Sequence, residues 1–313
     1  MGGATTAPAP AHRPGYSDDV TTSALFAGLA TLDIVQLVEA LPSPNQKVAA
    51  LDFTVCAGGP AANAAVAFAH CGGAATLATA LPEHPLAAPL RADLERCGVE
   101  IVAAASYDGP PITASIMITR ATGDRAVVSP TGVATAGALE PTHEASLDGV
   151  SAVLIDGYFP SVSLPIAARA RAAGVPVILD AGSHKPHTDA MVAACDIAVV
   201  SDDYAPPGTA GSPDRVVDHV LGLGASAAVI TRGSRPVLYR TRTADGSVAI
   251  PPVSPVRDTL GAGDFFHGAL AWRIASLGRD DARLAEDIAF ASAVVARSLG
   301  SFGTRAWLEK ENG

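Results

Sequence analysis

The feature that most constrains this fold is a regular alternation of short apolar runs with longer segments of helical periodicity. The runs are Ala152–Asp156, Val175–Asp180, Ile197–Ser201 and Ala227–Thr231, and the helical segments between them are Leu164–Ala173, His187–Ala194 and Asp214–Leu223. The stretches Val-Pro-Val-Ile-Leu and Ile-Ala-Val-Val are apolar on both faces, as a buried parallel sheet requires. The alternation therefore predicts an α/β fold with a doubly wound, mostly parallel central sheet flanked by helices.

Composition narrows the function further. Hydrophobic residues make up 49% of the 313 residues but aromatic residues only 5%, so the core is built mainly from small aliphatic side chains. The formal net charge of −10 argues against a nucleic-acid binder, because affinity for phosphate backbones comes from Lys and Arg. An acidic protein still binds an anion locally when backbone N–H groups face it.

The chain ends and the cysteines indicate where the protein works. Residues 1–22 are rich in Ala, Thr and Pro and lack the pattern of a signal peptide, so we expect a disordered tail before one domain over residues 23–313. No apolar stretch reaches about 18 residues, and no membrane span is expected. The four cysteines form no C-x-x-C pair, which favours reduced thiols and a cytoplasmic protein.

Two segments interrupt the alternation. Val48–Cys56 alternates apolar and polar residues, and Ile112–Thr119 and Arg125–Ser129 flank a turn of the β-hairpin type. We assign these strands, at about 45–57 and 110–131, to a small β-sheet lid. Ligands of open α/β sheets bind beyond the carboxyl ends of the strands, so a lid there covers a substrate. Two copies of the chain are expected to pair through this lid.

The segment from Asp258 to Asp264, Asp-Thr-Leu-Gly-Ala-Gly-Asp, carries the most chemical information. Its Gly-Ala-Gly, at the start of a helical segment, leaves backbone N–H groups uncovered, and with the helix dipole these form an anion site. Asp264 would repel a bound phosphate, so the role left to it is to take a proton from a hydroxyl that attacks phosphorus. A glycine-rich turn with an Asp cap is the structural alternative.

With the following Phe-Phe-x-Gly-Ala-Leu, this segment resembles the signature of the ribokinase-like, or PfkB-type, carbohydrate kinase family. Further family landmarks occur in the right order, at Gly28–Val35, Gly58–Asn63, Thr231–Gly233 and Phe290–Gly300. The resemblance covers residues 23 to 308. Gly-Leu-x-x-Leu-Asp and Leu-Gly-Ser-Phe-Gly look nearer to ketohexokinase than to ribokinase.

This resemblance implies an ATP-dependent kinase that transfers the γ-phosphoryl group to a hydroxymethyl group of a sugar or sugar-like substrate. Asp264 would be the base, and the anion hole would come from Gly261, Ala262 and Gly263. The substrate hydroxyls would be held by Asp33, Gly59 and Asn63. The nucleotide would lie over Thr231, Gly233 and Ser292.

The resemblance also implies cations. Mg²⁺ accompanies the phosphates, and K⁺ would be held by carbonyls of Asp258 and Leu260 with the loop near Gly300. The family's Asn-x-x-Glu, which organises water around Mg²⁺, is replaced here by Ser-Asp-Asp-Tyr, and Asp202 or Asp203 would take over as hard oxygen ligands.

Two further departures from the family pattern concern the substrate and the nucleotide. Pro60 stands where ketohexokinase has a substrate-contacting Asn, and proline offers neither a side-chain donor nor an N–H, which disfavours fructose. Pro236 replaces the second Gly after the Thr-x-Gly turn.

Three alternatives differ in what the sequence should contain. A nucleoside kinase shares the motifs and differs only in the pocket. A non-catalytic sugar-binding relative would be expected to have lost Asp264. A Rossmann-type dehydrogenase needs G-x-G-x-x-G after the first strand, where this chain has Gly-Leu-Ala-Thr, and it is discarded.

Overall fold

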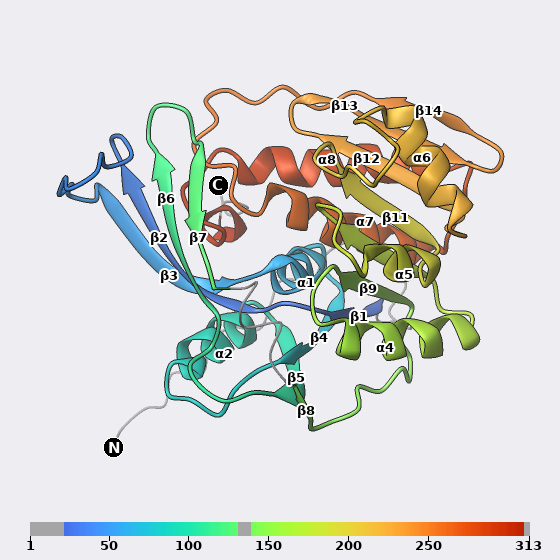
Figure 1. Cartoon of the computed structure of the whole chain (residues 1–313), viewed down its shortest axis with the longest axis horizontal. Helices are drawn as coiled ribbons and strands as arrows, with labels where there is room; N and C mark the ends of the chain where they lie inside the picture. The colour runs from blue at the N-terminus through green and yellow to red at the C-terminus, as the bar shows by residue number, and fades with distance from the viewer. Residues whose placement is uncertain (1–21, 131–138, 310–313) are drawn as a thin grey trace, which may run out of the picture.

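The computed structural model describes residues 22–130 and 139–309, in which a ten-stranded sheet forms the centre and a four-stranded sheet projects from one side (Figure 1). The strand order in the large sheet is β14 (Asp245–Val248), β13 (Arg235–Thr241), β12 (Ala227–Arg232), β11 (Ile197–Ser201), β10 (Val177–Ala181), β9 (Ala152–Asp156), β1 (Ser23–Ala27), β4 (Ala74–Ala80), β5 (Val99–Ser106) and β8 (Glu140–Pro141). All neighbours from β12 to β5 are parallel, and the outer strands are antiparallel. The predicted mostly parallel α/β fold is confirmed.

Helices cover both faces of the large sheet. One face carries α1 (Pro60–His70), α2 (Ala87–Arg96), α7 (Ala262–Leu277) and α8 (Leu284–Ser298), and the other carries α4 (Pro160–Ala172), α5 (Thr188–Ala193) and α6 (Pro213–Gly222). Successive side chains of a strand point to opposite faces, so Phe26 of β1 packs with the first group and Leu25 with the second. Both layers of the core consist mainly of aliphatic residues, many of them alanine and valine, as the composition predicts.

Helices α1 and α7 approach each other unusually closely. A Cβ atom added at Gly268 of α7 would lie 2.1 Å from the carbonyl oxygen of Ala64 in α1. Only glycine fits there, because the opposing atom belongs to the backbone and cannot move aside cheaply. The two helices are therefore held backbone to backbone, which fixes the relation between their N-termini.

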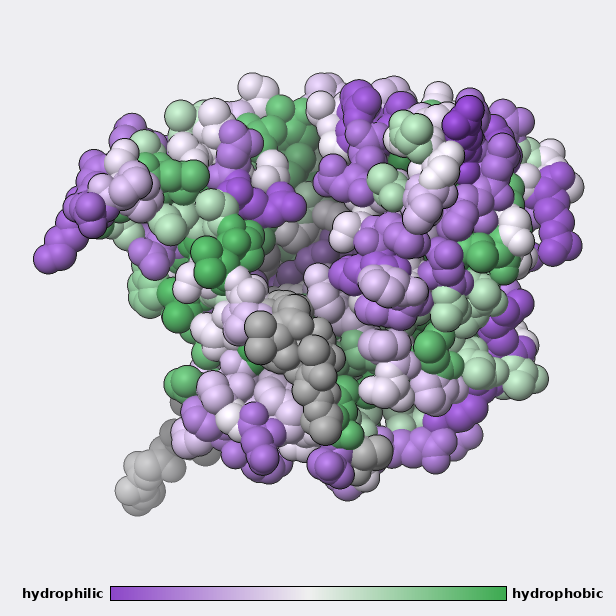
Figure 2. Space-filling model, viewed as in Figure 1, coloured by the Kyte–Doolittle hydropathy of each residue, from purple (hydrophilic) through white to green (hydrophobic). Residues whose placement is uncertain are grey.

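The second sheet has the order β3 (Asp52–Gly58), β2 (Thr31–Val38), β6 (Thr113–Thr119) and β7 (Arg125–Val128). Its inner face, which includes Val35 and Ile116, packs against Leu260 and Phe302 of the main body. Figure 2 shows a hollow between this sheet and the body. Both segments predicted for the lid supply strands to it.

Strand β2 corrects one detail of the sequence analysis. The resemblance of Gly28–Val35 to the family's first strand and substrate-binding Asp predicts that Asp33 follows the first strand of the large sheet. The backbone pairing of the second sheet instead runs without a break from Thr31 to Leu37 against β3, with Asp33 opposite Cys56. Asp33 therefore sits inside a strand of the second sheet, where both neighbouring strands fix its position.

Three further sequence predictions concern membrane-spanning helices, the cysteines and the N-terminal tail. Among the residues that the structure describes, no helix combines the length and apolar character needed to cross a bilayer. The four cysteines, all within the described residues, form no disulfide with one another, and two of them are buried and two half-buried. The tail predicted over residues 1–22 lies, apart from Thr22, outside the described residues.

Candidate active site

The carboxyl ends of the central parallel strands and the N-termini of α1 and α7 meet at one edge of the large sheet. Strands β9 and β10 carry Asp156 and Asp180 near these ends, and α7 begins just after Gly261. Gly261 has φ 74°, the left-handed region that favours glycine, and no described side chain caps the helix. The first turn of α7 thus has no side-chain cap, which suits the predicted anion site, although the Ala262 N–H donates 3.3 Å to the carbonyl of Thr259.

Asp264 and Asn63 contact each other across the two helices. The Asn63 amide nitrogen donates a hydrogen bond of 2.9 Å to Asp264 Oδ2. Burial, and then the nearby charge of Asp180, raise the pKa of Asp264, whereas the Asn63 bond lowers it. The helix contact at Gly268 is what makes this pairing rigid, since each side chain lies in the first turn of its helix.

Asp180 and His267 form a second layer beneath Asp264. His267 is buried in α7 one turn after Asp264, and its Nδ1 lies 3.3 Å from Asp180 Oδ2. Asp180 is itself only 8% exposed. Sequence analysis assigned neither residue to the site. The signal available was an Asp at the end of an apolar run, which in a parallel sheet places a carboxylate at the ligand edge.

Asp33 faces the main body from the second sheet. It is 4% exposed, accepts a 2.6 Å hydrogen bond from the Thr31 hydroxyl, and lies so close to Gly58 that a Cβ there would be 1.9 Å from its Oδ2. The pKa of Asp33 is raised to about 6. Burial is the largest cause, the hydrogen bond from Thr31 lowers the pKa, and the charge of Asp264 raises it. The effect of the Asp264 charge on the pKa of Asp33 indicates that the two carboxylates lie close enough to interact.

Arg305 holds the Asn63 amide in place and was not foreseen. One guanidinium nitrogen donates 3.1 Å to Asn63 Oδ1, another donates 2.8 Å to the carbonyl of Ala57, and Nε bonds Asp93 Oδ2 at 3.0 Å. Because Arg305 occupies the oxygen of the Asn63 amide, the nitrogen must face Asp264. No motif surrounds Arg305, so the sequence offered no signal for this role.

Asp156 is a buried carboxylate that fixes the backbone around the site. Its oxygens accept N–H bonds from Leu29 at 2.8 Å, Ala61 at 3.2 Å and Tyr158 at 2.8 Å. Burial raises the pKa of Asp156 to about 7, and these three backbone bonds act in the opposite direction. Since its acceptors are occupied by backbone donors, Asp156 is structural: it joins the end of β1 to the start of α1, where Gly59 lies with φ 95°.

The residues predicted for the nucleotide are spread over two elements. Thr231 is half-buried at the end of β12, and Gly233, with φ 61°, forms the turn into β13. Ser292 of α8 is 2% exposed, and its hydroxyl donates 2.9 Å to the carbonyl of Ile288. Its side chain is thus engaged within its own helix and turned away from solvent.

The predicted magnesium ligands lie in the turn after β11. The Asp202 carboxylate pairs with Arg235 of β13. The backbone N–H of Asp203 donates a 3.2 Å hydrogen bond to the Ser201 hydroxyl. Both carboxylates are exposed. Neither is among the charges that act on the pKa of Asp264.

The two loops predicted to hold a monovalent cation lie side by side. The Asp258 carboxylate accepts N–H bonds from Leu260 at 2.7 Å and Gly303 at 2.8 Å, and the Arg257 amide donates 2.8 Å to the carbonyl of Leu299. The loop before α7 is therefore joined to the segment that contains Gly300. The Asp258 side chain is used for this junction, which leaves main-chain carbonyls as the predicted ligands.

A family model for pfkB family carbohydrate kinases matches residues 21–311, which is nearly the whole chain. The chain belongs to this family. A PfkB carbohydrate kinase is a sugar kinase. We therefore expect phosphoryl transfer to a sugar to take place at the edge of the large sheet where α7 begins, beside the carboxylates described above.

Solved structures agree with the fold. A putative ribokinase from Agrobacterium tumefaciens has a TM-score of 0.78 at 23% identity, over 92% of this chain and 94% of that one. Arabidopsis thaliana ribokinase complexed with ribose and ATP gives 0.70 at 21%, over 93% and 99%. Fructokinase from Xylella fastidiosa with bound ATP gives 0.71 at 21%, over 92% and 95%. The predicted closeness to ketohexokinase stays a prediction.

Proposed function

We propose that this PfkB kinase transfers the γ-phosphoryl group of ATP to a hydroxymethyl group of a sugar. Asp264 takes the proton of the attacking hydroxyl, and the N–H groups of Gly261, Ala262 and Gly263 stabilise the charge on the transferred group. Neighbours that carry ATP, a ribokinase and a fructokinase, support the choice of phosphoryl donor.

The observation that carries this proposal is the contact between Asn63 and Asp264. An Asn amide that donates to one carboxylate oxygen leaves the other oxygen to accept a proton. The raised pKa of Asp264, caused first by burial and next by Asp180, makes it a stronger base than a solvated Asp. A helix N-terminus without a side-chain cap beside such a base suits an attack on phosphorus.

Sugar recognition is assigned to Asp33, Gly59 and Asn63. A buried carboxylate and an amide offer several acceptors and donors to a polyol, and the fixed strand position of Asp33 makes their spacing specific. Pro60 opens α1 without an N–H or a polar side chain. The pocket therefore lacks one donor that a fructose-specific site would use, and an aldose or another polyol is favoured.

The donor set at the strand ends suits Mg²⁺, which prefers oxygen ligands and keeps several of its waters. Asp180 at the end of β10, or Asp202 and Asp203 after β11, would hold these waters, and the bound ion neutralises charge on the phosphates. Main-chain carbonyls of Asp258 and Leu260, beside the Gly300 segment, would hold K⁺. Thr231 and Gly233 would line the nucleotide, with the backbone around Ser292 closing that side.

The test is a panel of sugars and nucleosides scored by ADP release, with wild type and Asp264→Asn side by side. A positioned base contributes about 10²–10⁴ in rate, so we expect kcat on the best substrate to fall at least a hundredfold. The affinity for a non-hydrolysable ATP analogue should stay within about twofold. Turnover near the wild-type value in Asp264→Asn would remove the base assignment, and a preference for nucleosides would replace the sugar by a nucleoside.

The outer face of the second sheet supports a homodimer as the assembly of this kinase. Phe53, Val55 and Val128 are 60%, 42% and 70% exposed, and the strand register places all three on the face opposite Val35. An exposed apolar sheet face favours association. Light scattering should give twice the chain mass, and Phe53→Glu with Val128→Glu should give a monomer.

A further inference from the structure

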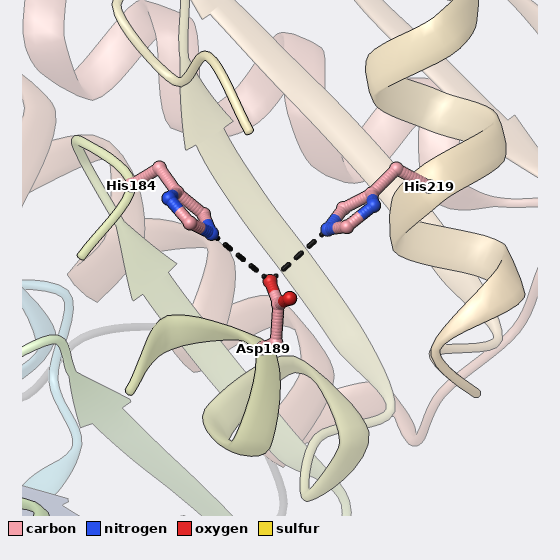
Figure 3. Close-up of side chains that lie close together, drawn as sticks. All are labelled: His184, Asp189 and His219. Atoms are coloured by element: carbon pink, nitrogen blue, oxygen red, sulfur yellow. Dashed lines mark hydrogen bonds and ion pairs between the residues drawn. The ribbon is translucent and has the colours of Figure 1, made fainter. Parts of the chain in front are cut away.

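Three side chains on the face of the sheet that carries α4, α5 and α6 converge on one point (Figure 3). His184 lies in the loop after β10, Asp189 in α5 and His219 in α6. The Nε2 atoms of the two histidines lie 3.1 Å and 3.0 Å from the same oxygen, Asp189 Oδ1. We infer that these three residues form a binding site for a divalent transition metal of the Zn²⁺ type.

The spacing of the three ligand atoms fits a tetrahedral ion. Zn²⁺ binds imidazole nitrogen and carboxylate oxygen at about 2.0–2.1 Å, which in a tetrahedron puts neighbouring ligand atoms about 3.3 Å apart. The two nitrogen–oxygen distances are within a few tenths of an ångström of that value, and all three atoms lie within 4.8 Å of one another. Small side-chain shifts would therefore admit the ion without a change of backbone.

The chemistry of the ligand set selects the metal. Two imidazoles and one carboxylate suit Zn²⁺, whereas Mg²⁺ and Ca²⁺ prefer sites made of oxygen alone. The side chains of His184, Asp189 and His219 are 20%, 43% and 23% exposed, so an ion can enter and keep a water as its fourth ligand.

Tyr204 gives independent evidence that a polar partner is missing beside His184. It packs edge-on against His184, with ring centroids 5.6 Å apart, and is 1% exposed. Its buried hydroxyl finds no hydrogen-bond partner in the described part of the chain. A metal-bound water is a partner that such a hydroxyl lacks.

An ion here would join the loop after β10 and the adjacent helix α5 to helix α6, which lies 30 residues further along the chain. His184 belongs to the same loop as His187, whose Nε2 contacts the carbonyl of Gly157 at 2.9 Å, and as Lys185, whose ammonium lies 4.6 Å from the ring centroid of Tyr158. A bound ion would therefore hold this loop against α5 and α6. Its role is structural, and it stands independently of the proposed kinase reaction.

The test uses the full chain expressed without a polyhistidine tag, stripped with a chelator and titrated with ZnCl₂ by calorimetry. We expect one Zn²⁺ per chain, and a rise in Tm of about 4 °C when free Zn²⁺ exceeds Kd a hundredfold. Asp189→Asn and His219→Gln should each weaken binding at least tenfold. The matched control is His143→Gln, which removes an exposed imidazole outside the cluster and should bind as wild type does.

Co²⁺ gives a second readout that does not depend on variants. In the wild-type chain it should show the intense visible bands of a four-coordinate ion, and Zn²⁺ should displace it. Wild type that binds no stoichiometric Zn²⁺, or Co²⁺ that shows only weak six-coordinate bands, would overturn the inference. So would equal affinity in wild type and in folded Asp189→Asn. Should both cluster variants fail to fold, the Co²⁺ spectrum of wild type decides.

Discussion

Replacement of Arg305 by Met tests whether a residue outside every motif sets up the sugar site. Met keeps most of the length and apolar bulk of the side chain but removes the bonds to Asn63, Ala57 and Asp93. The Asn63 amide is then free to turn over and present its oxygen to Asp264. Arg305 is also one of the charges that lower the pKa of Asp33 against the dominant effect of burial.

The magnitudes follow from these contacts. Removing one partner of a buried ion pair costs about 3–5 kcal/mol, but Asp93 keeps Arg96 and the Ala57 amide, so about 2–3 kcal/mol is expected. For a chain of this size that corresponds to a fall in Tm of about 4 °C. Loss of one oriented hydrogen bond at the sugar, about 1–1.5 kcal/mol, lowers kcat/KM about tenfold. The apparent pKa of Asp33 should rise above about 6.

The assay measures kcat/KM for the best sugar, the Kd of a non-hydrolysable ATP analogue and Tm. The matched control is Arg96→Met, which also removes a partner of Asp93 but does not touch Asn63. It should lower Tm slightly and leave kcat/KM unchanged, because the Arg96 side chain is 69% exposed. Equal losses of kcat/KM in the two variants would refute a role of Arg305 in positioning Asn63, as would a loss confined to ATP binding.

Further expectations concern the sugar, the helix contact and the cation. Asp33→Ala should lower kcat/KM for the sugar tenfold to a hundredfold and leave ATP affinity unchanged, because about 1.5–3 kcal/mol is lost for each hydrogen bond to a buried charge. A variant that loses ATP binding but still binds the sugar would show that we have placed the two substrates the wrong way round. Burial raises the pKa of Asp33 to about 6, so its charged form predominates only above that pH. Sugar binding measured by calorimetry should therefore weaken as the pH falls through about 6, and an Asp33→Asn variant should show no such change. Gly268→Ala puts a Cβ 2.1 Å from a backbone oxygen and should cost about 1–3 kcal/mol in chemical denaturation, whereas Gly222→Ala, in open space in α6, should cost nothing. K⁺ should raise activity over a tetramethylammonium control, and equal rates would remove the cation site near Asp258.

The parts of the fold that could be predicted are those in which local pattern and tertiary environment agree. Strands β9 to β12 are apolar except near their C-terminal ends because helices cover both faces of the sheet, and this apolar pattern makes them predictable from sequence. Strands β4 and β5 were not assigned. Their Ala-rich sequences favour helix by propensity, and only pairing with β1 in the buried sheet makes them strands.

The candidate site divides in the same way. Residues of the α7 motif could be predicted because anion binding at a helix start needs a fixed local sequence. Arg305, Asp180 and His267 reach the site through tertiary contacts, and no short pattern marks them. The His184, Asp189 and His219 cluster was missed for a related reason: its members lie on three segments, so no ligand spacing along the chain reveals it.

The backbone contact between Gly268 and Ala64 holds together two of the polar side chains of the candidate site, Asn63 and Asp264. It makes Asn63 and Asp264 parts of one rigid body, while Asp33 lies on a separate sheet whose connections to that body include Gly28–Ala30 and Gly59. If Asp33 and Asp264 have the roles proposed above, a tilt of that sheet would move the sugar-binding carboxylate and leave the contact between Asn63 and Asp264 unchanged. We therefore expect substitutions in the second sheet to change substrate preference more than they change the rate of phosphoryl transfer.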